Sequence, residues 1–382
     1  MTPPPRTDAM KTVRPFRQRS LVPSKYVKNT PRQTGGGRNR ASLVKRARQS
    51  ISKGSKSFAA AAWLFDKDTR ERAWLLYAWC RRCDDIADGQ DHGFKEGGGD
   101  LRLDKSSAQD RVEAIRILTH RALDGQPTAD IAFDAFGQVA SEVGITREMA
   151  DDVIDGFALD ARGWRPRTEA DLMRYCFHVA GAVGVMMAKV MGVPSDETEV
   201  LDRACDLGLA FQLNNIARDI SEDDAAGRCY LPEEWLVEHD IPPGQHMKPQ
   251  YRKELVAMAK RLVKMAERHD AAARVGAWQL PFRRRWAVLS AANIYGAIGE
   301  EVRQQAELAW DHRIHTSFLE KIGHTWNALR ESFSPPYDPV EWPEYTRGQL
   351  MVMARMDAPP APMPNTPIRD EGVRSARDVE PG

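Results

Sequence analysis

Apolar residues recur every three to four positions through most of the chain between residues 68 and 332. This spacing keeps apolar side chains on one face of a helix, which has 3.6 residues per turn. No run of alternating β-branched residues indicates a strand. The pattern therefore predicts an all-α fold. We expect helices at residues 68–88, 108–123, 128–142, 147–161, 169–191, 197–222, 250–274, 283–309 and 316–332.

Two of the predicted helices are apolar on nearly every side except for one polar line. A helix of this kind is usually buried, and buried charges persist only when they are paired or bound to metal. These polar lines are therefore the best candidates for a functional site. They comprise Tyr77, Arg81, Asp84 and Asp88 in the first helix, and Gln212, Asn215, Asp219 and Asp223 in the second.

Each polar line carries two carboxylates four residues apart, so that both lie on one face of the helix. We call Asp84 and Asp88 the first acidic motif, and Asp219 and Asp223 the second. Magnesium prefers oxygen ligands and is commonly shared between a few carboxylates and the phosphates of a substrate. Two such motifs facing one another predict a diphosphate between them. A solvated helical face is the alternative, but Arg81 and Asn215 lie in register and favour the metal site.

The motifs resemble those of the squalene and phytoene synthase family of head-to-head prenyl synthases. Residues 77–88 read YAWCRRCDDIAD and residues 212–223 read QLNNIARDISED, which match the two acidic motifs of the family. Residues 55–58, 175–181 and 227–232 match further family segments in the same order. The likeness runs from about residue 50 to about residue 330. It implies an isoprenoid-synthase-like, single-domain helix bundle around a central cavity.

The resemblance also implies roles for individual residues. Three Mg²⁺ ions are the usual complement of the family, with Mn²⁺ as an alternative. The expected metal ligands are Asp84, Asp88, Asn215, Asp219 and Asp223. The expected catalytic residues are the four motif aspartates together with Tyr77, Arg81 and Arg228. The expected substrate-binding residues are Ser55, Lys56, Ser57, Phe58, Tyr77, Arg81, Tyr175, Val179, Gln212, Asn215, Arg228, Tyr230 and Tyr295.

Carbocations formed from a prenyl diphosphate react with water, so the rest of the cavity should be apolar and dry. The residues expected to line it are Phe58, Val179, Ala180, Gly184, Leu209 and Phe211. Each of them is also suited to an ordinary helical core. Tyr295 resembles a family tyrosine near the cavity, where its π-face can stabilise a cation.

The wording of the second acidic motif favours the phytoene-forming branch of the family. In that reaction, which belongs to carotenoid biosynthesis, two geranylgeranyl diphosphates form prephytoene diphosphate and then phytoene, with release of two diphosphates. A transferase needing no nicotinamide cofactor is expected, and the chain has no dinucleotide-binding glycine motif. One alternative is squalene or dehydrosqualene synthesis from farnesyl diphosphate. Another is an inactive, membrane-associated assembly factor of the same fold, although the complete acidic motifs speak against it.

The two ends of the chain differ in composition from its middle. Residues 1–50 carry thirteen Lys or Arg against one acid, and residues 357–382 contain six prolines. We expect a disordered basic arm at 1–50, a catalytic domain at 51–333 and a disordered tail at 334–382. Its basic composition is suited to binding anionic lipid or nucleic acid, or to a transit-like segment. The alternative is that the arm has no role. Residues 89–107, which contain three consecutive glycines, are expected to be a cover for the site or a surface insertion.

No uninterrupted apolar stretch is long enough to span a membrane. We expect a cytoplasmic protein with peripheral membrane contact, reduced cysteines and no nucleic-acid partner, and the sequence leaves its oligomeric state open.

A third aspartate pair, Asp151 and Asp155, follows a helix start at Thr146. Acids favour the first turn of a helix, so this pair is interpreted as structural.

Overall fold

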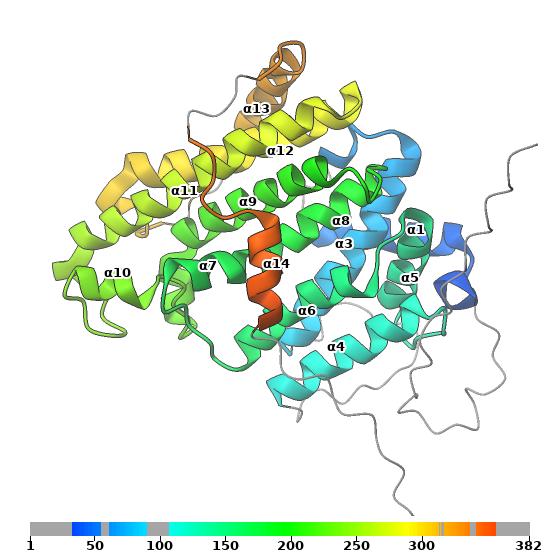
Figure 1. Ribbon diagram of the computed structural model, residues 1–382, viewed down its shortest axis with the longest axis horizontal. Helices are drawn as coiled ribbons and strands as arrows, with labels where there is room; N and C mark the ends of the chain where they lie inside the picture. Colours follow the sequence, from blue (N-terminus) through cyan, green and yellow to red (C-terminus); the bar gives the residue numbers. More distant parts are fainter. Residues whose placement is uncertain are drawn as a thin grey trace, which may run out of the picture.

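The computed structural model describes residues 33–54, 61–89, 107–312, 314, 317–336 and 341–356. This part of the chain contains helices and no strand, which confirms the all-α prediction (Figure 1). Its helices are α1 (Arg40–Gly54), α3 (Lys67–Ala87), α4 (Ala108–Leu123), α5 (Ile131–Val143), α6 (Arg147–Ala161), α7 (Glu169–Cys176), α8 (Ala182–Val190), α9 (Thr198–Ala225), α10 (Glu233–Glu238), α11 (Arg252–Trp278), α12 (Phe282–Gln305), α13 (Phe318–Glu331) and α14 (Arg347–Met356). Short turns η1 (Thr34–Gly37), η3 (Phe177–Gly181), η4 (Pro249–Tyr251) and η5 (Ala306–Leu308) connect some of them.

Helix α9 lies at the centre of the bundle, with α8 on one side and the α11–α12 hairpin on the other (Figure 1). Its buried residues include Leu209, Leu213 and Ile216, which belong to one continuous hydrophobic core. Since Asp219 and Asp223 lie on the same helix, the core that fixes α9 also fixes the second acidic motif.

Side-chain caps define where the helices of the site begin. Asp66 accepts a hydrogen bond from the Thr69 amide at 2.9 Å at the start of α3, and Thr146 caps α6 in the same way. Such caps satisfy backbone N–H groups that have no partner within the helix. They fix the register of α3 and α6, whose C-terminal ends both face the polar site.

Helices α8 and α9 approach closely because glycines stand at their contact. A methyl group on Gly184 would overlap the carbonyl oxygen of Ala204, and one on Gly208 would overlap that of Ala180. The expected helix at 169–191 is interrupted there by the π-helical turn η3, which is five residues long. A π-turn changes which side chains face inward, and such turns are frequent at functional sites.

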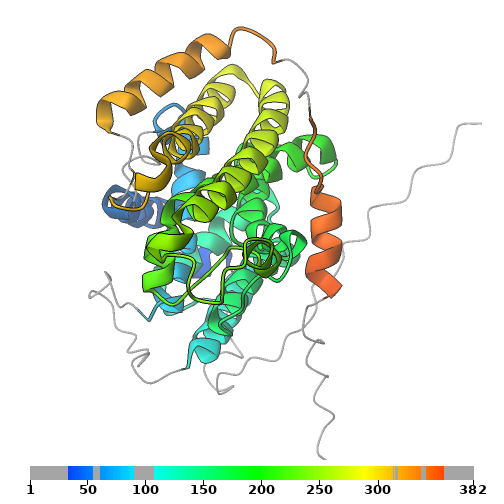
Figure 2. The ribbon, with the colours of Figure 1, turned by 90° about the vertical axis from the view of Figure 1, so that its left-hand side faces the viewer.

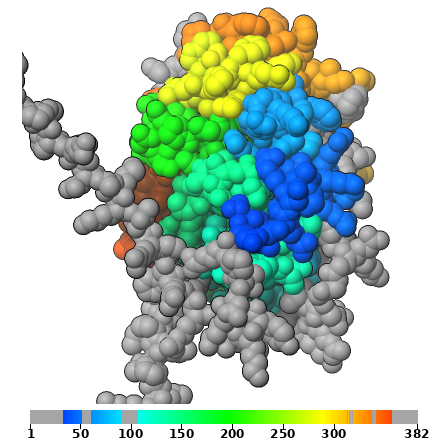
Figure 3. Space-filling model, turned by 90° about the vertical axis from the view of Figure 1, so that its right-hand side faces the viewer, coloured from blue at the N-terminus to red at the C-terminus, as the bar shows by residue number. Residues whose placement is uncertain are grey.

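Part of the expected basic arm belongs to the fold, which corrects the boundary at residue 50. Leu43, Ala47 and Ile51 of α1 are buried, and α1 packs on α3 and α5 (Figure 3). Arg40 of this segment pairs with an acid that is distant in the sequence, since its Nε lies 2.6 Å from a carboxylate oxygen of Glu142. The rest of the arm, residues 1–32, lies outside the described residues.

The expected C-terminal tail also contains folded structure, so the boundary at residue 333 is corrected as well. Helix α14 buries Leu350 and Ala354 against α7, η3 and α9. Residues 357–382 and 90–106 lie outside the described part of the chain. Among the described helices, none combines the length and apolarity needed to cross a membrane.

Candidate active site

The polar line of α3 faces a polar pocket of about 390 Å³. Arg81, Asp84 and Asp88 line this pocket, and Asp88 ends α3 as its C-cap. Arg81 forms an ion pair with Asp85, with 2.7 Å between Nη2 and Oδ1. Asp85 is thus the buried carboxylate that holds Arg81 at the pocket.

The polar line of α9 carries the second acidic motif. The Arg218 guanidinium makes two hydrogen bonds to the Asp219 carboxylate, one of them 2.6 Å long from Nε to Oδ1. One turn earlier, Asn215 presents a buried Oδ1 that has no hydrogen-bond partner in the described structure. A buried oxygen without a donor is costly, because it loses its bonds to water without replacement. Asn215 is therefore poised to accept a cation or a donor from a ligand.

Arg228, which follows the second motif, connects the two polar lines. Its Nη2 lies 3.6 Å from Oδ1 of Asp88, and its charge lowers the pKa of Asp223 against the opposing influence of burial. Asp160 of α6 acts electrostatically on Asp223 and is itself influenced by Asp88. Through these interactions, the polar lines of α3 and α9 come close to one another, as the sequence pattern predicts.

Burial and neighbouring carboxylates raise the pKa values of two motif aspartates, so that both carboxyl groups titrate near neutral pH. Burial raises the pKa of Asp84 to about 7, with Asp88 adding to the shift and Arg81 opposing it. Burial likewise raises the pKa of Asp223 to about 7, with Asp219 as the next cause. Carboxylates whose charges are this poorly compensated form a site that favours cations.

These shifts predict a pH-dependent effect of divalent metal on stability. Because the pKa values of Asp84 and Asp223 lie above the usual 3.8, their contribution to stability is present below about pH 4 and is lost as the pH rises through about 7. A metal ion bound by these carboxylates would replace the protons, so Mg²⁺ should raise the melting temperature more at pH 8 than at pH 5.5. Thermal denaturation with and without Mg²⁺ measures this difference. An equal effect at both pH values, or one that persists in the Asp84→Asn/Asp223→Asn variant, would contradict it.

Asp160 is a site residue that the sequence patterns did not reveal. It accepts hydrogen bonds from the hydroxyls of Tyr175 at 3.1 Å and Tyr230 at 3.0 Å, and the two tyrosine rings stack at 4.7 Å. The hydroxyl of Tyr230, an expected substrate-binding residue, is thus engaged by a carboxylate. Burial raises the pKa of Asp160, which lines the polar pocket beside Arg228.

Removing the Asp160 charge should weaken metal binding. We expect Asp160→Asn to raise the dissociation constant for Mg²⁺ about 10-fold if the motifs hold the metal, since the Asp160 charge acts on Asp223 and Asp88 acts on Asp160. Isothermal titration calorimetry measures the constant. The control is Tyr175→Phe, which removes a hydrogen bond but keeps the carboxylate. Equal affinities of Asp160→Asn and the parent protein would show that Asp160 only holds the tyrosines.

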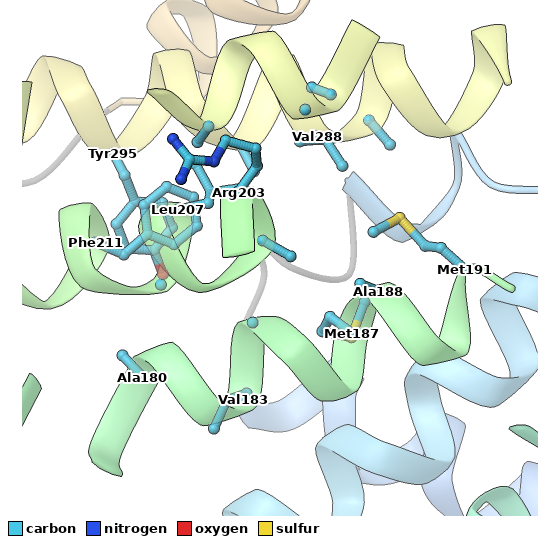
Figure 4. Close-up of a pocket in the computed structure, with 18 of the residues that line it drawn as sticks. Ala180, Val183, Met187, Ala188, Met191, Arg203, Leu207, Phe211, Val288 and Tyr295 are labelled. Carbon is cyan, nitrogen blue, oxygen red and sulfur yellow. The ribbon is translucent and has the colours of Figure 1, made fainter. Parts of the chain in front are cut away.

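An apolar cavity of about 340 Å³ lies between α8, α9 and the α11–α12 hairpin (Figure 4). Four of the expected lining residues are confirmed in it, namely Val179, Ala180, Gly184 and Phe211. Leu209 is corrected, because it points into the core and does not line the cavity. Tyr295 lines the wall as expected and stacks on Phe211 with ring centroids 4.1 Å apart.

The cavity and the acidic motifs share residues of α9. Gln212 and Asn215 line the cavity, and Asp219 follows Asn215 by one turn. An extended apolar molecule with a charged head can therefore lie along α9, its tail in the cavity and its head at the motifs. Tyr77, which is half-buried on α3, has its pKa raised by burial. Ser55, Lys56, Ser57 and Phe58 lie outside the described residues.

The residues that would hold a metal ion supply oxygen atoms only, which suits a hard divalent cation. In the described ranges, no three His, Cys, Asp or Glu side chains gather closely enough to hold a metal ion. Each acidic motif offers two carboxylates, so oxygens of a substrate and water would have to complete the coordination. The unpartnered oxygen of Asn215 and the raised pKa values of Asp84 and Asp223 fit this arrangement.

The third aspartate pair is engaged elsewhere. Asp151 and Asp155 accept hydrogen bonds from Arg116 at 2.9 and 2.7 Å, in keeping with the structural interpretation.

The five cysteines form no disulfide, and burial raises the pKa of the Cys80 and Cys83 thiols. The thiols of Cys80 and Cys83 therefore stay protonated and are unreactive at neutral pH.

The chain belongs to the squalene/phytoene synthase family, whose sequence profile matches residues 51–320. This confirms the resemblance carried by the motifs, and enzymes of this family are prenyl-transferring and generally depend on divalent metal. Two proteins similar to this chain are both named phytoene synthases. A phytoene synthase of Pseudescherichia vulneris is 47% identical over 280 residues, which cover 73% of this chain and 89% of the relative. A 15-cis-phytoene synthase of Pantoea ananas is 43% identical over 284 residues, which cover 74% and 90%.

The fold is also that of a solved family member. The crystal structure of a dehydrosqualene synthase in complex with ligand matches with a TM-score of 0.66 and 27% sequence identity. The match covers 76% of this chain and 97% of the other. It confirms the expected helical bundle of the isoprenoid-synthase type.

Proposed function

We propose that this protein is a 15-cis-phytoene synthase that joins two geranylgeranyl diphosphates head to head in carotenoid biosynthesis. The observation that carries the proposal is the high identity, 47% and 43%, to proteins named phytoene synthase over most of both chains. The apolar cavity beside two acidic motifs supports it, because the substrate combines a long hydrocarbon tail with a diphosphate.

The proposed reaction has two ionisation steps. In the first, a carbon–oxygen bond to diphosphate breaks, and the resulting allylic cation is captured by the double bond of the second substrate. Loss of a proton gives the cyclopropane of prephytoene diphosphate. In the second, the remaining diphosphate leaves, the cation rearranges, and loss of a second proton gives phytoene. Two diphosphates and two protons are released, and no reductant is consumed.

The residues of this chain have complementary tasks in the proposal. Asp84, Asp88, Asn215, Asp219 and Asp223 would hold Mg²⁺, which neutralises the diphosphate when bound. Arg81 and Arg228 add positive charge at the departing diphosphate, as electrostatic stabilisation of a leaving group requires.

The cavity would protect the cationic intermediates. Its wall is built mainly from Ala, Val and Gly, which offer no nucleophile and exclude water. The stacked rings of Phe211 and Tyr295 present π-faces that attract a cation. Tyr175 and Tyr230 would orient Asp160 at the pocket, and Gln212 would contact the substrate near its head.

The decisive experiment supplies the purified chain and Mg²⁺ separately with geranylgeranyl and farnesyl diphosphate, without nicotinamide cofactor. We expect a C40 conjugated triene from the C20 substrate, identified by chromatography, mass and ultraviolet spectrum. A C30 product alone would instead assign squalene or dehydrosqualene synthesis. If neither product nor diphosphate appears, the chain is an inactive member of the fold.

A further inference from the structure

The outer face of α13 carries exposed apolar side chains in a single stripe. Leu319, Ile322 and Trp326 follow helical spacing and are 78, 51 and 64% exposed. Phe333, two residues beyond the helix, is 69% exposed. Large apolar side chains scattered singly on a surface need no explanation, but three along one helical stripe and a fourth just beyond it indicate an interaction site.

This stripe faces away from the rest of the bundle. Helix α13 packs chiefly on α12 and is the outermost helix on its side of the molecule (Figure 2). Ala328 is buried against α12, and the Trp286 indole N–H donates to the Thr325 carbonyl at 2.9 Å. These contacts occupy the opposite side of the helix, so the stripe is left without a partner within the described chain.

Aromatic contacts extend the stripe to the start of α12. The ring of Phe282, itself 39% exposed, lies 5.2 Å from that of Phe333. From the next residue, Arg283 Nε donates at 3.1 Å to the carbonyl of Leu64, whose neighbour Trp63 is exposed. We call Leu319, Ile322, Trp326, Phe333, Phe282 and Trp63 the apolar face.

Arginines without a carboxylate partner in the described structure surround the apolar face. Arg283 and Arg285 bind carbonyl oxygens, and Arg330 is exposed on α13. By contrast, three nearby acids are already engaged. Glu331 pairs with Arg274 at 2.8 Å, Asp66 caps α3, and Glu320 accepts from the Ser317 amide at 2.7 Å in the capping box of α13. The surface therefore combines Trp, Phe and Leu with uncompensated positive charge, which is the composition of helices that lie in the interface of anionic membranes.

The position of the apolar face relates it to the cavity. Ala277 and Val288 line the cavity, and the same two residues pack with Ala328 of α13. Leu280, which also lines the cavity, is two residues from Phe282. Only the α11–α12 hairpin thus separates the cavity from the apolar face.

We propose that the apolar face is a membrane-docking surface that binds bilayers containing anionic phospholipid. Docking would place the cavity beside the bilayer, into which a hydrocarbon product can pass without crossing water. The transfer of a hydrocarbon product into the bilayer rests on the proposed function. The docking itself does not, and it is measured without any prenyl substrate.

The test is vesicle flotation of the full-length chain. Vesicles of phosphatidylcholine with about 30% phosphatidylglycerol are compared with vesicles of phosphatidylcholine alone. We expect Leu319→Ser/Ile322→Ser/Trp326→Ser to lower the partition coefficient for anionic vesicles at least about 10-fold, because three apolar side chains no longer enter the interface. The matched control is Val237→Ser/Val352→Ser/Met356→Ser, which changes three exposed apolar residues on α10 and α14 and should bind like the parent.

A charge variant tests the same surface without removing apolar contacts. Arg283→Gln/Arg330→Gln should abolish the preference for anionic vesicles, and it serves even if the triple serine variant fails to fold. Deletion of residues 1–32 should leave most of the binding intact. Binding that depends on residues 1–32 and not on the apolar face would overturn the proposal. So would light scattering that shows a dimer, dissociated by the triple variant, in a protein that does not bind vesicles.

Discussion

Asp84→Ala is expected to lower the rate of diphosphate release on the order of 10³-fold, with thermal stability retained or raised. Asp84 lines the polar pocket, and its carboxylate lacks a firm cationic partner because Arg81 pairs with Asp85. Without it, the first acidic motif keeps one ligand, and the departing diphosphate is less well neutralised. Asp219→Ala should have an effect of the same size on the opposite side. Release of diphosphate at saturating Mg²⁺ measures both.

The third aspartate pair provides a matched control for this prediction. Asp155→Ala removes a carboxylate from an identical spacing, but Asp155 binds Arg116 at 2.7 Å outside the site. We expect it to change the rate less than about threefold while lowering stability, because Arg116 loses a partner. If Asp84→Ala and Asp155→Ala slow the reaction equally, the acidic motifs are not the metal site.

Gly208→Ala is expected to lower the free energy of unfolding by about 3 kcal/mol, a large effect for one methyl group. A Cβ at this position would overlap the carbonyl oxygen of Ala180 and lie 2.7 Å from its carbon. Both are backbone atoms that cannot rotate away, so α9 must separate from η3, the turn that precedes α8. Urea denaturation measures the loss, and the wider gap should also lower the rate of product formation.

Gly323→Ala is the control for this substitution. Gly323 lies in α13 with open space where a Cβ would be, so alanine should stabilise the helix by up to about 1 kcal/mol. Similar losses in both variants would mean that the loss at Gly208 does not come from its contact with the backbone of Ala180.

The helices could be predicted because their patterns are local. The segment expected at 147–161 coincides with α6, and that expected at 108–123 coincides with α4. The π-turn at Phe177–Gly181 could not be predicted, since its apolar residues fit an α-helix equally well. What selects it is the packing of α7, η3 and α8 against α6 and α9.

Helix α1 was missed because the basic charge of the arm obscured its apolar spacing. Leu43, Ala47 and Ile51 recur every four residues, as in a helix with a buried face. The charge is tolerated because Glu71 and Glu142 meet Arg40 in the folded chain. Partners separated by 31 and 102 residues leave no local signal.

The two acidic motifs of the candidate site could be predicted from the sequence, whereas the residues that support them could not. Asp84 and Asp223 stand out because a carboxylate is unusual in an apolar helix. Asp160 does not, since its role depends on Tyr175 and Tyr230, and the latter lies 70 residues away. The position of Leu209 was wrong because a helix pattern tells which residues are buried, but not which of them border an empty space.

The 28 residues of α9 form one rod about 42 Å long. One half of this rod borders the cavity through Gly208 and Phe211, and the other half carries Asp219 and Asp223. A slide or rotation of α9 would displace both halves together. Substitutions that change the length of the cavity without moving the acidic motifs are therefore expected on other walls, such as Val183 of α8 and Val288 of α12.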